Sequence, residues 1–273
     1  MGAINAIVIS GNGTNCEMEM AHACKLAGFD RVDIVPVYDL LAGETGLDDY
    51  HMLNLAGGFL DGDDLGSAKA AANVYKHARI GGDGEYIADA IGRFIEQGKC
   101  ILGVCNGFQL LTKLGLLPAI GGAYFEQQVT LTFNDRGRFE DRWCYLKVEP
   151  TAPCIFTQGL SKVYLPVRHG EGKFVARDQS TLDALESGNH VVLRYADASG
   201  NPTDQYPANP NGSQNSIAGI CDTTGRVFGL MPHPEAFLHF TNHPRWTREN
   251  LPEEGDGAAL FKNACTYLKQ QFK

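Results

Sequence analysis

A glycine-flanked cysteine, placed where an apolar run gives way to a helical pattern, constrains this chain more than any other feature. Residues 100–104 form a short apolar run typical of a buried strand, and after residue 106 the apolar side chains recur at helical spacing. Cys105 therefore lies where a strand turns directly into a helix, with Gly103 and Gly107 on either side. Gly-x-Cys-x-Gly is the cysteine form of the nucleophile elbow, a turn so tight that a side chain on either flank would collide.

The position also gives Cys105 the chemical setting of a nucleophile. The partial positive charge at a helix N-terminus favours a thiolate there. A free cysteine between a strand and a helix is also commonly a core residue that only packs. The elbow therefore predicts a catalytic cysteine on the condition that the rest of the chain supplies a base.

A candidate base lies in the Pro-His-Pro-Glu segment at 232–235, which follows a predicted hairpin over 217–231. The two prolines restrict the backbone, and His233 and Glu235 at i and i+2 start on the same side of the chain. A histidine oriented by a carboxylate is the usual base that activates a nucleophile. Taken alone, such a segment is also compatible with a surface turn. Together with Cys105 it completes a triad of nucleophile, base and orienting carboxylate.

A second glycine-rich stretch is a candidate for stabilising an oxyanion. Gly57-Gly58-Phe59 follows a predicted strand at 52–56, and three of the six residues 57–62 are glycines. A loop with such backbone freedom can turn its N–H groups toward a developing oxyanion, as acyl transfer requires. A plain connection between a strand and a helix is the alternative. The acidic residues within 61–64 do not form the EF-hand pattern, so we assign no metal to them.

Two weaker motifs do not lead to an assignment. The Gly-Asn-Gly stretch at 11–13 is similar to a dinucleotide fingerprint, but the third glycine is missing and a tight turn is the simpler interpretation. His239 and His243 have the i, i+4 spacing of a helical zinc site without an evident third ligand. We therefore expect residues 237–255 to form a surface or partner-facing loop.

Composition excludes several classes of protein. The 273 residues are 44% hydrophobic, which suits a globular protein with a sizeable core. The net charge of −9 argues against nucleic acid or an anionic membrane surface as a partner. No apolar run reaches the roughly 18 residues of a membrane span, and the N-terminal segment lacks the features of a signal peptide. Eight cysteines without a Cys-x-x-Cys pair indicate reduced thiols, so we expect a cytoplasmic protein.

The order of the predicted elements indicates an α/β fold, with a mainly parallel sheet flanked by helices and an antiparallel extension. We expect a single domain over residues 1–273. In such sheets the working groups collect at the carboxyl ends of the strands, where both Cys105 and Gly58 fall. Strands are predicted at 6–10, 32–38, 52–56, 100–104, 129–134, 143–149, 163–167, 217–221 and 227–231, with residues 168–172 interrupting them. Helices are predicted up to residue 26, over 64–80 and 84–97, after residue 106, and over 258–271, with a loop at 196–215.

The elbow and the Pro-His-Pro-Glu segment together resemble the class I (triad) glutamine amidotransferases. Three further stretches narrow the resemblance to the glutaminase component of phosphoribosylformylglycinamidine synthase, an enzyme of purine biosynthesis. The resemblance covers nearly the whole chain and thins at 66–98, 135–165 and 237–255. The three stretches are Gly57-Gly58-Phe59 with Gly62-Asp63, His169-Gly170-Glu171-Gly172, and Asn209-Pro210-Asn211-Gly212-Ser213 leading to 217–220.

This resemblance implies a role for each matching residue. Cys105 would attack the side-chain amide of glutamine and form a glutamyl thioester. His233 would act first as base and then as acid to the departing ammonia, with Glu235 orienting it. The N–H groups of Gly58 and Asn106 would stabilise the oxyanion. The implied substrate-binding residues are Gly57, Gly58, Phe59, Asn106, Gln109, His169, Gly170 and Glu171.

The resemblance also implies partners. The family passes ammonia to a separate synthetase subunit, often joined by a small accessory subunit, and ATP and magnesium are used by the synthetase, so no cofactor is expected in this chain. Ala56 stands where the family usually has proline, which predicts a less rigid oxyanion loop. The alternative interpretations are a glutaminase subunit serving another synthetase, a cysteine hydrolase of related fold, and a binding module with a decayed site.

Overall fold

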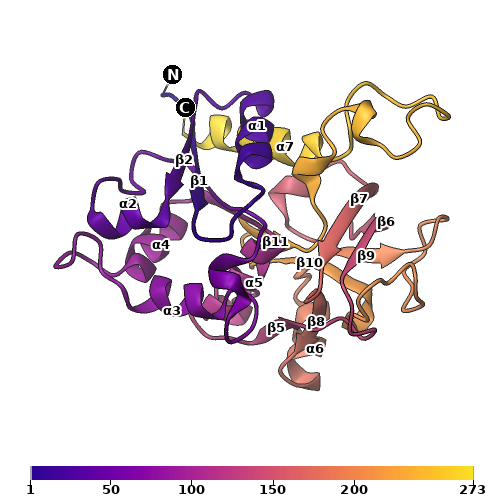
Figure 1. Cartoon of the computed structure of the whole chain (residues 1–273), viewed down its shortest axis with the longest axis horizontal. Coiled ribbons are helices and arrows are strands. Elements are labelled where there is room, and N and C mark those ends of the chain that lie inside the picture. The colour runs from indigo at the N-terminus through magenta and orange to yellow at the C-terminus, as the bar shows by residue number, and fades with distance from the viewer. Residues whose placement is uncertain (1, 273) are drawn as a thin grey trace.

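The computed structural model describes residues 2–272 and is built around a nine-stranded sheet (Figure 1). One half of this sheet is parallel, and the three of its strands nearest the antiparallel half are buried along their whole length, as is usual for parallel strands covered on both faces. The parallel strands are, in spatial order, β2 (Arg31–Pro36), β1 (Asn5–Ser10), β3 (Met52–Leu55), β4 (Cys100–Val104) and β11 (Val227–Leu230).

The other half of the sheet is antiparallel, which confirms the predicted fold class. A separate two-stranded antiparallel ribbon, β5 (Val129–Thr132) with β8 (Lys173–Ala176), lies outside the main sheet. The antiparallel strands continue from β11 in the order β10 (Ile217–Cys221), β9 (Val191–Ala196), β6 (Glu140–Val148) and β7 (Lys162–His169).

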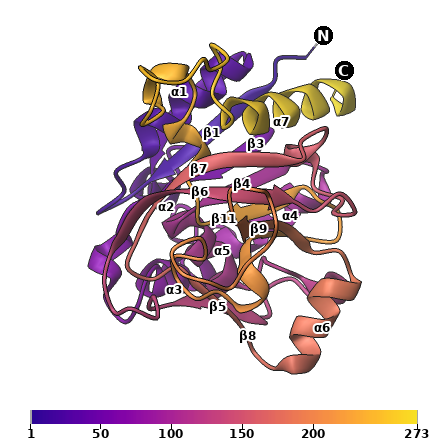
Figure 2. The same cartoon turned by 90° about the vertical axis from the view of Figure 1, so that its right-hand side faces the viewer.

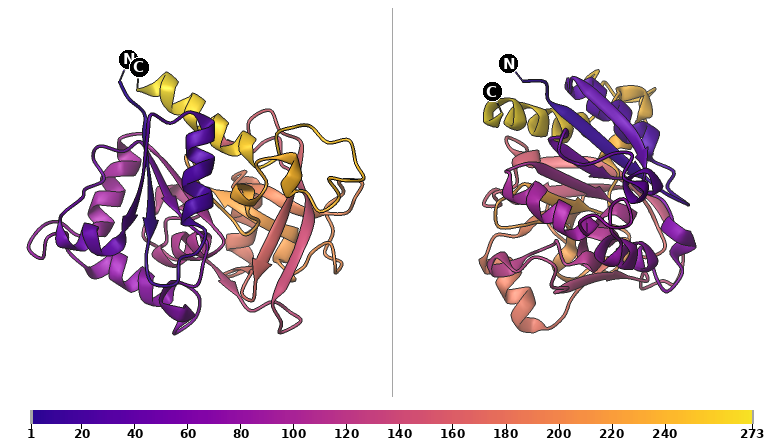
Figure 3. Two further views of the ribbon diagram at one scale, coloured as in Figure 1. Left: turned by 45° about the horizontal axis from the view of Figure 1, so that its top comes forward. Right: turned by 90° about the vertical axis from the view of Figure 1, so that its left-hand side faces the viewer.

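Helices cover both faces of the parallel half. One group contains α1 and α7, which pack together, and the other contains α3, which contacts α4 and α5 (Figure 3). Gly28 adopts a left-handed backbone with φ 91° and ends α1, as the sequence predicted. The helices are α1 (Glu17–Ala27), α2 (Val37–Ala42), α3 (Lys69–His77), α4 (Ile87–Glu96), α5 (Asn106–Leu114), α6 (Gln179–Ser187) and α7 (Ala258–Gln271).

Several predicted boundaries in the first half of the chain are wrong. The strand expected over 32–38 ends at Pro36, and α2 begins at the next residue. The helix expected over 64–80 begins only at Lys69, because Leu65 and Ala68 have left-handed φ values of 63° and 55° that no helix accommodates. The helix expected over 84–97 begins at Ile87.

The second half departs further from the prediction. Arg168 and His169 end β7 and do not interrupt it. The strand predicted over 129–134 is β5, which pairs with β8 and is not part of the main sheet. No element was predicted at the residues of β8, α6 or β9, whereas the closing helix α7 lies at the predicted residues 258–271.

The strand register brings three loops to one edge of the sheet. Leu55 of β3 pairs with Gly103 of β4, and Leu230 of β11 pairs with Val104 of β4, so the carboxyl ends of these neighbouring strands are level. The sheet also bends back on itself, since β7 lies at the far end of the strand order and still approaches the segment after β11 (Figure 2). The backbone N–H of His233 donates to the carbonyl of Pro166 in β7 at 2.8 Å.

None of the helices formed by residues 2–272 has the length and apolar character that crossing a bilayer requires. A continuous cluster of buried apolar side chains packs against the sheet, from Ile4 near the start to Leu268 in α7. The expectation of one domain over residues 1–273 stays a prediction, which this continuous core supports.

Removing a large core side chain from α7 is expected to destabilise the protein. Phe261 is fully buried, so Phe261→Ala should lower the free energy of unfolding by about 3–5 kcal/mol through lost apolar burial and the cavity left behind. The matched variant Phe133→Ala, at a side chain that is 68% exposed, should change it by less than about 0.5 kcal/mol. Urea denaturation measures both, and equal effects would contradict the packing of α7 described here.

Candidate active site

The elbow geometry at Cys105 matches the prediction from sequence. Cys105 lies between β4 and α5 as the N-cap of α5, with φ 53° and ψ −105°, a strained backbone for a residue other than glycine. A Cβ atom on Gly107 would lie 1.9 Å from the carbonyl oxygen of Leu55, and one on Gly103 would lie 2.5 Å from a methyl carbon of Leu111. Glycine is therefore required on both sides of Cys105.

His233 and Glu235 form a buried pair beside the elbow. The Nδ1 atom of His233 lies 2.6 Å from Oε1 of Glu235, and both side chains are almost fully buried. Burial by itself lowers the pKa of His233, but the Glu235 carboxylate and the nearby Cys105 thiol outweigh it and hold that pKa well above its usual value. The Nε2 atom of His233 has no hydrogen-bond partner among residues 2–272, so it is free to exchange a proton.

The backbone of the Gly57–Gly58 loop presents an N–H group beside Cys105 and His233. The carbonyl of Gly57 accepts hydrogen bonds from the N–H groups of Asn15 and Cys16, each at 3.2 Å. Because the peptide is planar and trans, the N–H of Gly58 points the opposite way. That N–H and the one of Asn106, in the first turn of α5, take part in no backbone hydrogen bond among the described residues.

A pocket of about 670 Å³, counted to its open mouth, connects these groups. The thiol of Cys105 lies 3.7 Å from the carbonyl oxygen of Arg168, at the end of β7. Besides His233, the lining includes one acidic residue, Glu19, and one basic residue, Arg168. The lining residues are Asn15, Cys16, Glu19, Gly58, Phe59, Cys105, Phe139, Arg168 and His233.

Cys16, His233 and Glu235 bring three metal-binding side chains within 4.8 Å of one another. The 2.6 Å distance between His233 Nδ1 and Glu235 Oε1 suits a direct charge-assisted hydrogen bond. Two ligands of one zinc ion, each about 2.0–2.2 Å from the metal at tetrahedral angles, would lie farther apart. The arrangement therefore fits an acid–base pair better than a metal centre.

Comparisons with known proteins agree with this geometry. The family model of the CobB/CobQ-like glutamine amidotransferase domain matches residues 3–268. The chain belongs to this glutamine amidotransferase family. It is 43% identical to the phosphoribosylformylglycinamidine synthase subunit PurQ of Dehalococcoides mccartyi, over 99% of this chain and 100% of that protein. It is 41% identical to the subunit of the same name from Methanococcus maripaludis, over 97% of each chain.

A solved structure of a related complex has the same fold. A chain of the PurLQS structure from Thermotoga maritima is 31% identical, with a TM-score of 0.71, and the match covers 97% of this glutamine amidotransferase and 99% of that chain. The nine-stranded sheet described here is therefore an arrangement also found in a solved relative.

The structure places the predicted site residues of this glutamine amidotransferase in three positions. Gly58, Phe59, Cys105 and His233 line the pocket. Gly57 lies directly behind it, where an added Cβ atom would be 2.9 Å from the His233 ring and 3.5 Å from Cys105 Cβ. Glu235, Asn106, Gln109, His169, Gly170 and Glu171 lie outside the lining and support it.

The side chains of Asn106 and Gln109 form hydrogen bonds with other groups of the protein. Asn106 accepts from the N–H of Leu60 at 2.9 Å and donates to the Gln109 side-chain oxygen at 2.8 Å. Gln109 in turn donates to the backbone carbonyl of Glu171 at 2.6 Å. These bonds join the elbow helix α5 to both loops beside the pocket, so the two amides shape the pocket wall.

His169 is held neutral in the interior. Burial, with the positive charge of His233 as a second cause, lowers the pKa of His169 to about 3. Its Nδ1 lies 3.2 Å from the side-chain oxygen of Asn134, and the N–H of Asn134 donates to the Gly170 carbonyl at 2.9 Å. The Glu171 carboxylate accepts from the Ser67 hydroxyl at 2.9 Å. This turn is thereby fixed by side chains distant in sequence.

Sequence reasoning missed part of the pocket wall. Asn15 and Cys16 lie just before α1, and Glu19 lies in its first turn. This segment follows β1, and the strand order places β1 beside β3. Arg168 was visible only as the neighbour of a matched motif, and Phe139 carried no signal in the sequence. Both reach the pocket because the antiparallel half of the sheet bends back.

His239 and His243 do not form the zinc site that their spacing made conceivable. The Nδ1 atom of His243 accepts from the N–H of Arg245 at 3.2 Å, and its ring packs 5.4 Å from that of Trp143 and 5.6 Å from that of Phe237. The Nδ1 atom of His239 lies 2.9 Å from the Thr241 hydroxyl. The 237–255 loop was expected at the surface, but its residue His243 is buried.

The two buried histidines should titrate differently. Replacing Glu235 with Gln removes the carboxylate that raises the pKa of His233, so His233 should gain its proton at lower pH in Glu235→Gln than in the parent. His169, with a pKa of about 3, should stay neutral between about pH 5 and pH 8 in both proteins. Histidine side-chain NMR signals measure both. An unchanged His233 titration, or a His169 that titrates near neutral pH, would contradict the electrostatics described here, and Glu44→Gln at an exposed position is the control.

Proposed function

We propose that this chain is the glutaminase subunit of phosphoribosylformylglycinamidine synthase, hydrolysing glutamine to glutamate and ammonia. The observation that carries the proposal is the convergence of Cys105, the His233–Glu235 pair and the free Gly58 N–H on one pocket. The 43% and 41% identical relatives, matched over nearly their whole length, carry the name of this subunit.

In the first chemical step Cys105 acts as the nucleophile. The thiol proton passes to Nε2 of His233 before the attack, because Glu235 holds the pKa of His233 well above its usual value, and Nε2 has no other partner among residues 2–272. The thiolate sulfur of Cys105 then forms a bond to the amide carbon of glutamine. The amide oxygen becomes an oxyanion and accepts hydrogen bonds from the N–H groups of Gly58 and Asn106. Glu235 holds the imidazole through Nδ1 and stabilises its positive charge.

The second step releases ammonia and restores the thiol. His233 gives its proton to the amide nitrogen, the carbon–nitrogen bond breaks, and a glutamyl thioester and ammonia remain. A water molecule then adds to the thioester carbon while His233 accepts one of its protons. The carbon–sulfur bond breaks, the sulfur takes that proton back from His233, and glutamate leaves.

The charged side chains on the pocket wall suit the other end of glutamine. Glu19 and Arg168 both line the pocket. A free amino acid carries an ammonium and a carboxylate on its α carbon, and one protein group of each opposite charge in the pocket would hold both. We propose that Glu19 binds the ammonium and Arg168 the carboxylate, which selects free glutamine over an internal glutamine of a peptide.

The ammonia serves a partner in this proposal. The solved relative belongs to a PurLQS complex, and we propose a synthetase subunit and a small accessory subunit as the partners of this chain as well. ATP and magnesium act on the synthetase, so this chain needs no cofactor of its own. We place the protein in the cytoplasm, supported by eight cysteines that all remain unpaired.

Loss of the nucleophile is the direct test of the reaction. Cys105→Ala, assayed with the synthetase and accessory subunits, should lower glutamine-dependent synthesis by at least about 10⁴-fold. Synthesis supported by added ammonia should be unchanged, because the synthetase site is intact. Cys265→Ala, at a buried thiol of α7, is the matched control. Unchanged use of glutamine by Cys105→Ala would refute the proposed role of Cys105.

The same assay separates the proposal from the alternatives. If the chain serves another synthetase, the phosphoribosylformylglycinamidine synthetase subunit would form no product from glutamine, although Cys105 would still react with glutamine. A cysteine hydrolase of related fold would cleave esters or peptides faster than glutamine. Either result would overturn the assignment to phosphoribosylformylglycinamidine synthase.

Neutralising either pocket charge should weaken glutamine binding more than catalysis. Glu19→Gln and Arg168→Gln should each raise KM for glutamine about 10-fold, the worth of one charge-assisted hydrogen bond, with kcat within about threefold of the parent. Glu44→Gln and Arg248→Gln change the same charges at exposed positions away from the pocket and should change neither. A KM unchanged in both pocket variants would contradict this mode of recognition.

A further inference from the structure

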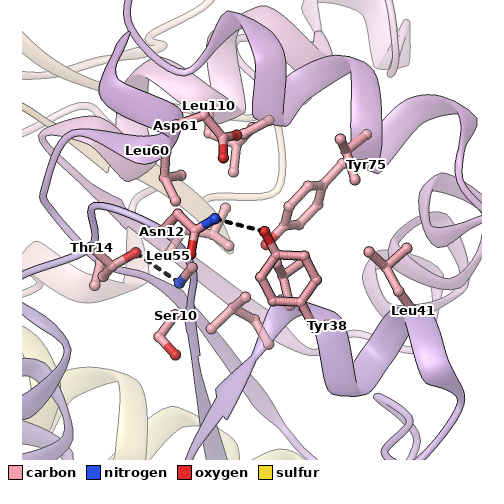
Figure 4. Close-up of a pocket in the computed structure, with 16 residues that line it drawn as sticks. Ser10, Asn12, Thr14, Tyr38, Leu41, Leu55, Leu60, Asp61, Tyr75 and Leu110 are labelled. Atoms are coloured by element: carbon pink, nitrogen blue, oxygen red, sulfur yellow. Dashed lines mark hydrogen bonds between the residues drawn. The ribbon is translucent and has the colours of Figure 1, made fainter. Parts of the chain in front are cut away.

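A second cavity lies beside the oxyanion loop, at the carboxyl ends of β1 and β3, and encloses about 600 Å³ counted to its mouth (Figure 4). From β1 the chain runs to β2 on one side and then to β3 on the other. In open α/β sheets, ligands bind outside the strand ends where the strand order reverses in this way. Apolar side chains form most of the wall: Ile9, Val37, Leu41, Leu55, Leu60 and Leu110.

The glycine loop after β1 forms one side of this cavity. Gly11 lines it, and a Cβ atom there would lie 3.1 Å from Leu60 Cδ2, so glycine keeps this part of the wall open. Asn12 donates from its side chain to the Tyr38 hydroxyl at 2.8 Å, across the rim (Figure 4). This loop resembled a nucleotide-binding motif in sequence, and the reaction at Cys105 gives its side chains no role.

Tyr75 supplies a polar group on the cavity wall. The residue is only 4% exposed and lines the cavity. Burial, and to a smaller degree the Asp61 carboxylate, raise the pKa of Tyr75, so the hydroxyl stays protonated and available as a donor. A hydroxyl on a largely apolar wall can donate this proton to an acceptor atom of a bound molecule.

The charge of the wall restricts what can bind. Asp61 is the only Asp, Glu, Lys, Arg or His side chain among the residues that line the cavity. An anion would meet a like charge and find no cation, which excludes binding through a phosphate. Tyr38 and Tyr75 both line the cavity and offer aromatic surface (Figure 4). A carboxylate and a hydroxyl on such a wall favour an uncharged ring that both donates and accepts hydrogen bonds.

We propose that this cavity binds a neutral heteroaromatic molecule of nucleobase size, which donates an N–H hydrogen bond to Asp61 and accepts one from the Tyr75 hydroxyl. The site adjoins the oxyanion loop, because the Asp61 N–H donates to the Asn12 carbonyl and the Phe59 N–H to the Gly13 carbonyl, each at 2.8 Å.

The test uses uracil and orotate, which differ by one carboxylate. Titrated into the isotope-labelled chain, uracil should bind with a dissociation constant of about 1 mM or tighter and move the backbone amide signals of Asn12, Asp61 and Tyr75. Orotate should bind at least about 10-fold more weakly, since its carboxylate faces Asp61. Absence of uracil binding, equal binding of both, or shifts confined to the pocket at Cys105 would each overturn the proposal.

Two variants locate the site. Ala71 is buried on α3 and lines the cavity, so Ala71→Leu should fill it and weaken uracil binding at least about 10-fold. Tyr75→Phe keeps the ring, removes the hydroxyl and should weaken binding about fivefold. Tyr86→Phe, at a tyrosine outside the cavity, is the matched control. Circular dichroism checks folding; if Ala71→Leu does not fold, Tyr75→Phe decides, and unchanged binding in it refutes the site.

Discussion

The level ends of β3, β4 and β11 are the constraint on which the active site depends. The N–H of Cys105 donates to the Leu230 carbonyl at 2.8 Å, which ties the residue after β4 to the last residue of β11. Residues 57–58 leave β3 at the same level on the other side, because Leu55 pairs with Gly103. A shift of one residue in either pairing would turn alternate side chains to the opposite face and separate the thiol from its base and its oxyanion donor.

The oxyanion loop gains its rigidity from a neighbouring element. Ala56 in place of the family's proline predicted a looser loop, yet Ala56 is buried, and the N–H groups of Asn15 and Cys16, the two residues before α1, both donate to the Gly57 carbonyl. The direction of the Gly58 N–H is therefore fixed by contacts distant in sequence, and the restraint that proline would give locally is supplied by packing.

Sequence alone predicted what depends on neighbours along the chain. The elbow at Cys105, the His233–Glu235 pair at i and i+2, and α7 each follow from local spacing, and all three are found as expected. Glu19 and Arg168 were missed as pocket residues, because their approach to Cys105 depends on the strand order and on the bend of the antiparallel half. Ala68 has a left-handed backbone, so α3 begins only after it. The sequence does not reveal such a residue, because tertiary contacts set its backbone conformation.

His233 and His169 are both buried beside the pocket, but their surroundings shift their pKa values in opposite directions. Burial disfavours the charged form of both, but only His233 has a carboxylate in contact, and its pKa rises while that of His169 falls to about 3. The charge on His233 is itself one of the causes that keep His169 neutral. Of these two histidines, only His233 beside Cys105 carries a positive charge, and the neutral His169 fixes the turn at Gly170 through Asn134. The contact with Glu235, two residues along the chain, makes His233 the base, whereas His169 has no such carboxylate and has a structural role.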